Sequence, residues 1–232
     1  MSRLNAQVDT LFWFAAPDVS SAIGETPVYL RFLTQDQPAD VEVSLPANGT
    51  FTPVTISIPS NSVDSINLSP FIAMIESPSA NAVNTNGIKI SATANINAIY
   101  ELRSNTSKAV FSLKGQKGIG NEFYTPFQKN YATSVVSPGT NASIEIVATE
   151  DNTTVLITPR SNITGHSMNT TFSVTLNKGQ TYSARDVNAT GAVSLAGSII
   201  SSNKPVAVTV RSEEHTSELQ SHHDLVCRLV LE

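Results

Sequence analysis

Apolar and polar residues alternate with period two along most of this chain, and no other feature constrains the fold as much. In residues 28–32, for example, Val28, Leu30 and Phe32 fall on one side of an extended backbone, and the residues between them fall on the other. The same alternation recurs in residues 41–45, 54–58, 88–90, 96–100, 144–146, 155–157, 172–176 and 206–210. Each segment predicts a half-buried β-strand, so we expect an all-β fold.

Turn-forming clusters separate these segments, as at Pro46-Ala-Asn-Gly49 and Asn177-Lys-Gly179. Short strands at this spacing are typical of a β-sandwich or barrel. One short helix is predicted near residues 69–76, where Ser69 is placed to cap the helix and Pro70 occupies the favoured first helical position.

The chain also repeats itself at an interval of about 110 residues. Three pairs of similar short motifs occur in the same order, centred on Phe12 and Phe123, Asp36 and Asp151, and Ile90 and Ile200. We therefore predict two tandem β-sandwich-like domains, at residues 8–105 and 122–210, joined by a connecting strand or hinge at residues 106–121.

The C-terminal segment, Arg211–Glu232, does not resemble the rest of the chain. Its first twelve residues match the conceptual translation of a common sequencing adapter, so we expect residues 211–232 to be a non-native, adapter-derived tail. All but one of the histidines and the single cysteine lie in it, as His215, His222, His223 and Cys227. We therefore predict no metal site in the body of the chain; if the tail is genuinely encoded, this cluster becomes a candidate metal site.

Charge and hydropathy exclude two classes of partner. The tail contains two of the 14 Lys and Arg residues and five of the 19 Asp and Glu residues. The body therefore has 12 basic and 14 acidic residues, a formal net charge of −2. Nucleic-acid binding is not expected at this charge. Membrane insertion is not expected either, because no segment approaches the roughly 18 apolar residues of a membrane span. Leu4-Asn-Ala-Gln7 is consistent with the end of a bacterial signal peptide or with an ordinary linker.

The residues do not indicate an enzyme or a cofactor site. Asp36 and Asp151, the latter beside Glu150, suit calcium binding or acid–base chemistry, but Asp also begins turns by bonding its own backbone. His166 lies in a polar loop with no motif that joins it to a nucleophile. The glycines of residues 115–120 lack the ending of a phosphate-binding loop and read as a hinge.

Aromatic residues supply the candidate ligand contacts. In the run Phe12-Trp13-Phe14, Trp13 must point to the face opposite its two neighbours. Tyr124 occupies the matching place in the second repeat. Exposed, Trp13 and Tyr124 would stack on a sugar or anchor a protein partner. The alternative for Trp13 is that it packs between the two domains.

Four longer motifs carry a family resemblance. They are residues 118–128, 144–159, 176–182 and 202–208. In this order they resemble the N-terminal domain of IgGFc-binding proteins, above all of its bacterial members, and the similarity extends from Val8 to Val210. The resemblance implies a large secreted or cell-surface protein, often of Bacteroidetes-type bacteria.

We therefore predict a non-catalytic surface or secreted recognition module whose function is protein binding in adhesion. Two alternatives remain open. One is a carbohydrate-binding accessory module, and the other is a passive structural spacer of a large surface protein. The partner is a protein or a glycan of unspecified identity, because a fold-level resemblance indicates only a class of function.

Overall fold

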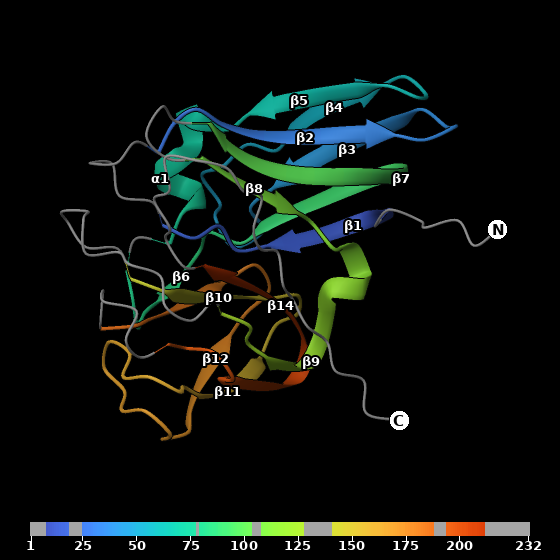
Figure 1. Cartoon of the computed structure of the whole chain (residues 1–232). Coiled ribbons are helices and arrows are strands. Elements are labelled where there is room, and N and C mark those ends of the chain that lie inside the picture. The colour runs from blue at the N-terminus through green and yellow to red at the C-terminus, as the bar shows by residue number, and fades with distance from the viewer. Residues whose placement is uncertain are drawn as a thin grey trace.

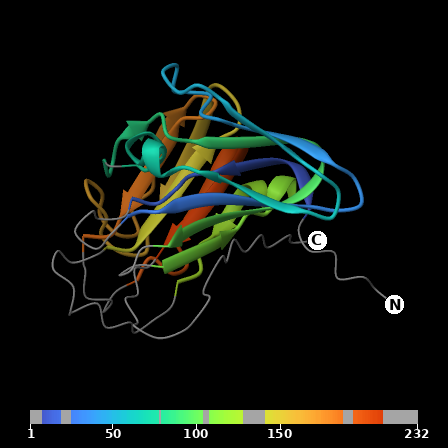
Figure 2. The same ribbon diagram turned by 90° about the horizontal axis from the view of Figure 1, so that it is seen from above.

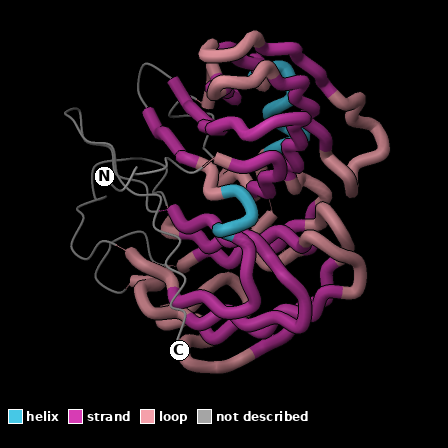
Figure 3. The backbone as a smooth tube through the Cα atoms, turned by 90° about the vertical axis from the view of Figure 1, so that its right-hand side faces the viewer, coloured by secondary structure: helices cyan, strands magenta, loops and turns pink. Residues whose placement is uncertain are grey.

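A computed structural model describes residues 8–18, 25–77, 79–103, 108–127, 141–187 and 194–211. The fold is all-β, with two domains, each built around its own sheet, and one short α-helix (Figures 1 and 3). This confirms the predicted fold class. Residues 212–232 of the predicted tail lie outside the described residues, whereas Arg211 is the last residue of a strand.

The first domain is organised around one long central strand, β7. Its strands are β1 (Asp9–Phe14), β2 (Val28–Thr34), β3 (Ala39–Ser44), β4 (Val54–Ile58), β5 (Val63–Asn67), β7 (Ile88–Arg103) and β8 (Lys108–Ser112). The sheet has the order β4-β3-β7-β2-β5, and β1 and β8 also pair with β7. Alternate side chains, such as Leu30 and Phe32 of β2, are fully buried in the core, as the period-two pattern predicts.

The second domain has the same plan, with β14 as its central strand. Its strands are β9 (Ile119–Tyr124), β10 (Ser143–Ala148), β11 (Thr153–Thr158), β12 (Phe172–Leu176), β13 (Thr181–Arg185) and β14 (Ile199–Arg211). The sheet order is β12-β11-β14-β10-β13-β6, and β9 also pairs with β14. The short β6 (Val83–Asn84) precedes β7 in the chain but pairs with β13, so the first half of the chain extends the second sheet.

The register of the strands shows that the domains are structural repeats. Phe12 of β1 pairs with Ile90 of β7, and Phe123 of β9 pairs with Ile200 of β14. These are two of the motif pairs predicted from sequence, and they occupy the same ladder position in each domain. Seen from above, the strands of one domain cross those of the other (Figure 2).

The helical segments are short. A 3-10 turn, η2 (Ser69–Phe71), leads into α1 (Ile72–Ile75), and a second turn, η3 (Gly115–Gly118), precedes β9. The helix lies where it was predicted, but Ser69 is not its cap: its hydroxyl accepts a hydrogen bond from the backbone N–H of Val28 at 3.0 Å. Among the described residues, no helix has the length and apolar character needed to cross a bilayer.

Candidate functional site

Trp13 lies at the interface between the domains. Its side chain is 8% exposed and packs, together with Ala15, against Val147 and Ala207. Trp13 lies in β1 of the first domain and Ala15 directly follows that strand, whereas Val147 and Ala207 come from β10 and β14 of the second domain (Figure 1). Trp13 therefore has the second of the two roles considered for it, that of an interdomain contact.

The two backbones also approach closely at the edge of this interface. Gly87 donates a backbone hydrogen bond to the carbonyl of Gly179 at 3.1 Å. A Cβ atom on Gly87 would lie 2.5 Å from that carbonyl oxygen and 2.5 Å from a methyl group of Val147. Only glycine fits at this position without a shift of the backbone.

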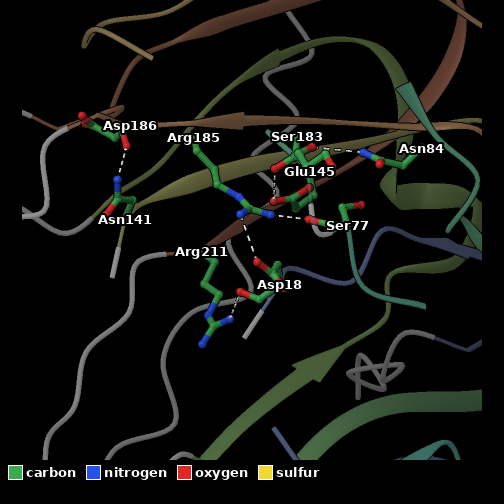
Figure 4. A network of polar contacts seen from close by, with 10 residues as sticks. Asp18, Ser77, Asn84, Asn141, Glu145, Ser183, Arg185, Asp186 and Arg211 are labelled. Atoms are coloured by element: carbon green, nitrogen blue, oxygen red, sulfur yellow. Dashed lines mark hydrogen bonds and ion pairs between the residues drawn. The ribbon is translucent and has the colours of Figure 1, made fainter. Parts of the chain in front are cut away.

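A buried polar network also lies at the interface. Glu145 of β10 is fully buried and accepts a hydrogen bond from the hydroxyl of Ser183 at 2.8 Å (Figure 4). Burial raises the pKa of Glu145 to about 7, although the Ser183 hydrogen bond and the positive charge of Arg185 act in the opposite direction. The interface thus contains a carboxyl group that titrates near neutral pH.

Arginines of the second domain reach across to the first. Arg185 forms an ion pair with Asp18 at 3.0 Å and donates a hydrogen bond to the backbone carbonyl of Ser77 (Figure 4). Arg211 donates to the backbone carbonyl of Asp18 at 3.0 Å. These contacts join residues far apart in the sequence, so the polar network couples the domains in addition to the apolar contact of Trp13.

Tyr124 is exposed, unlike its counterpart Trp13. Its side chain is 44% exposed and is paired across the ladder with Ile199. Leu156 of β11 is also 44% exposed and pairs with Ser201 of β14, two residues after Ile199. Because directly paired residues share a face of a sheet, these side chains lie on the outer face of β9, β14 and β11. We call this the Tyr124 face.

A second exposed apolar surface lies where the loop between β11 and β12 meets the segment that follows β13. The side-chain oxygen of Asn162 accepts a hydrogen bond from the backbone N–H of Met168 at 2.9 Å, and its carbonyl accepts one from Val187 at 3.0 Å. Met168 is 48% exposed and Val187 is 51% exposed. Asn162 therefore holds two exposed apolar residues close together, and we call them the Met168–Val187 surface.

His166 helps to hold the same loop in place. Its ring stacks on Phe172 with a centroid separation of 3.5 Å, and its Nε2 atom lies 3.0 Å from the side-chain oxygen of Asn81. That oxygen also accepts a hydrogen bond from the hydroxyl of Tyr182 at 2.6 Å. These contacts give His166 a structural role, in agreement with its interpretation as a loop residue.

The candidate carboxylates lie in a turn and a bend. Asp151 accepts a hydrogen bond from the backbone N–H of Lys178 at 3.0 Å. Asp36 lies exposed at the bend after β2. In the part of the chain that the structure describes, no group of three or more His, Cys, Asp or Glu residues is arranged to hold a metal ion.

The glycine-rich segment at residues 115–120 contacts a carboxylate of its own chain. Asp9 accepts a hydrogen bond from the backbone N–H of Gln116 at 2.8 Å and another from its side chain at 2.9 Å. Partial burial alone would raise the pKa of Asp9, but these hydrogen bonds hold it below its usual value. The backbone donor of Gln116, which a phosphate would need, is thus already used.

The second domain matches a known protein family. The family described as IgGFc binding protein matches residues 108–227, which is more than half of the 232 residues. The chain belongs to the IgGFc binding protein family. No curated protein and no solved structure matches it.

The match to the IgGFc binding family falls mainly on the second domain. It begins at β8 and includes β9 to β14. The Tyr124 face and the Met168–Val187 surface both lie within it, whereas Trp13 lies outside. IgGFc binding domains are non-enzymatic binding domains, so exposed surfaces of the second domain are the relevant candidates.

Proposed function

We propose that this chain is a non-catalytic recognition module of a secreted or cell-surface protein, and that it binds a protein partner in adhesion. The observation that supports this most is the family match over the second domain, together with the Met168–Val187 surface inside it. IgG Fc is the first partner to test, because the family description names it.

The Met168–Val187 surface has the physical properties of a protein-binding site. Two exposed apolar residues have their backbones bound to the same residue, Asn162, so a partner that covers both side chains gains free energy from apolar burial, at about 25 cal/mol per Å². Asn162 and the stacked His166 ring hold the loop in place before binding, which lowers the entropy cost of association. Methionine also adapts its shape to a partner surface.

Surface plasmon resonance of the full chain over immobilised IgG Fc, with Fab as the reference, tests this proposal. We expect binding to Fc that Val187→Asp weakens about tenfold or more, because the substitution places a charge in the contact. Val83→Asp changes a comparably exposed valine of β6, outside this surface, and serves as the matched control. Binding to neither Fc nor glycans would favour the passive spacer instead.

A carbohydrate-binding role is the second candidate, and the exposed Tyr124 favours it. Tyr124 is 44% exposed on a strand face, where an aromatic ring can stack on a sugar. A glycan array probed with the full chain and with Tyr124→Ala tests this role. Glycan binding that the variant loses would support it, and an array without signal from the unsubstituted chain would reject it.

A further inference from the structure

The two domains contact each other through different faces. The first domain contributes the outer face of β1, where Trp13 lies, and the second contributes the face of β10 and β14 that carries Val147 and Ala207 (Figure 1). The contact is therefore head to tail. Among the described residues, such a contact leaves the partner face of each domain uncovered at the two ends of the pair.

The Tyr124 face is the surface of the second domain that is equivalent to the surface around Trp13 in the first. Trp13 follows Phe12 in β1, and Tyr124 follows Phe123 in β9, where the two phenylalanines hold equivalent ladder positions. Trp13 is 8% exposed because the second domain covers it, whereas Tyr124 is 44% exposed. Figure 1 shows β9 and β11 on the side of the second domain that is farther from the first.

The first domain has a surface equivalent to the one around Val147 in the second domain. Val147 pairs with Ala207 on one side and with Thr181 on the other. Leu33 holds the equivalent position in the first domain, because it pairs with Asn97 on one side and with Val63 on the other. Val63 is 60% exposed, and β5 lies on the side of the first domain away from β1 (Figure 1). We call this the Val63 face.

Exposed apolar residues concentrate on these two faces. Of the seven large apolar residues that are exposed among the described residues, Tyr124 and Leu156 lie on the Tyr124 face, and Val63 and Val110 lie on the Val63 face. Val110 pairs with Glu101, and Glu101 pairs with Tyr29 of β2. Tyr29 and Leu33 share a face of β2, so Val110 lies on the Val63 face. Four of the seven thus mark surfaces equivalent to ones that the domains already bury.

The charges of the two faces are complementary. Glu122 is exposed on the Tyr124 face, where it pairs with Ser201. On the Val63 face, Arg31 and Arg103 share the single carboxylate of Glu101, which leaves a net positive charge. Bringing the faces together thus places Glu122 near an excess of arginine.

We propose that the Tyr124 face of one copy of this chain docks on the Val63 face of a second copy, and thereby repeats the contact that joins the two domains. Because the faces differ, each added copy presents a new free face, so the assembly grows head to tail. The occupant is a second copy because its Val63 face would continue the contact that already joins the two domains.

Sedimentation equilibrium of the full chain from about 1 to about 500 µM, the range of weak protein contacts, tests this proposal. We expect the weight-average mass to rise with concentration beyond that of a dimer. Val63→Asp and Tyr124→Asp each leave one face intact, so either variant alone is expected to stay monomeric. A mixture of the two is expected to form a dimer and nothing larger, because only one productive contact remains.

Val187→Asp is the matched control, since it changes a comparably exposed valine outside both faces and is expected to leave association unchanged. Circular dichroism of each variant checks that the strands are retained. A monomer at every concentration would overturn the proposal. Association that persists in both face variants, or a mixture that behaves like each variant alone, would overturn it as well.

Discussion

Glu145 accepts a hydrogen bond from Ser183 at 2.8 Å on the face of the second sheet that the first domain covers. Burial raises the pKa of Glu145 from its ordinary 4.5 to about 7. Between these values the folded protein holds a proton that the unfolded chain has lost. The free energy of unfolding is therefore expected to fall as pH rises through this window, by roughly 3 kcal/mol.

Glu145→Gln is expected to remove this dependence, because the amide stays neutral. The variant should be more stable than the natural chain above pH 7 and should differ little near pH 4.5. Urea unfolding at a series of pH values measures this, with the exposed Glu150→Gln as the control. Parallel pH profiles for Glu145→Gln and the natural chain would contradict the assignment.

Trp13→Ala and Tyr124→Ala change equivalent positions and are expected to differ strongly. The first empties a buried contact between the domains, so it should cost about 3–5 kcal/mol of unfolding free energy. The second changes an exposed residue and should stay within about 0.5 kcal/mol. Chemical denaturation compares the two, and equal losses would argue against the interdomain role of Trp13.

Gly87→Ala is expected to destabilise the domain interface by about 1–3 kcal/mol, since the new methyl group meets the Gly179 carbonyl and Val147. Gly49→Ala is the matched control, because no atom lies within 4 Å of a Cβ built there. Thermal unfolding together with limited proteolysis measures both variants. An interface that tolerates alanine at residue 87 would show that the backbones separate more easily than the structure indicates.

Asn162→Ala is expected to loosen the Met168–Val187 surface. It removes the acceptor for the backbone N–H of Met168 but keeps the carbonyl that binds Val187. The loss of one hydrogen bond should lower stability by only about 1 kcal/mol. Binding at this surface should weaken severalfold, which resonance measurements against IgG Fc can detect. Unchanged affinity would place the binding site elsewhere.

The sequence predicts the strands and the repeat because both depend on local pattern. Alternation identifies which residues share a face, and the Phe12 and Phe123 motifs occupy the equivalent positions that their spacing indicates. Alternation does not say whether a domain covers the other face. Glu145 sits between Ile144 and Ile146 and reads as a solvated residue, yet it is buried beneath the first domain.

The pairing of β6 with β13 could not be predicted either, since it joins a two-residue strand to a segment about 100 residues away. The Met168–Val187 surface was missed for a related reason. Its two apolar residues lie in polar sequence without periodicity, and only the hydrogen bonds of Asn162 bring them together. A sequence pattern does not encode such a contact.

Hydrogen–deuterium exchange of the full chain with and without IgG Fc tests the central claim most directly. We expect Fc to protect backbone amides of the loop that carries Met168 and of Val187, and to leave β5 unchanged. Protection confined to other segments, or no protection at Fc concentrations that saturate the resonance signal, would contradict a protein-binding role for this surface.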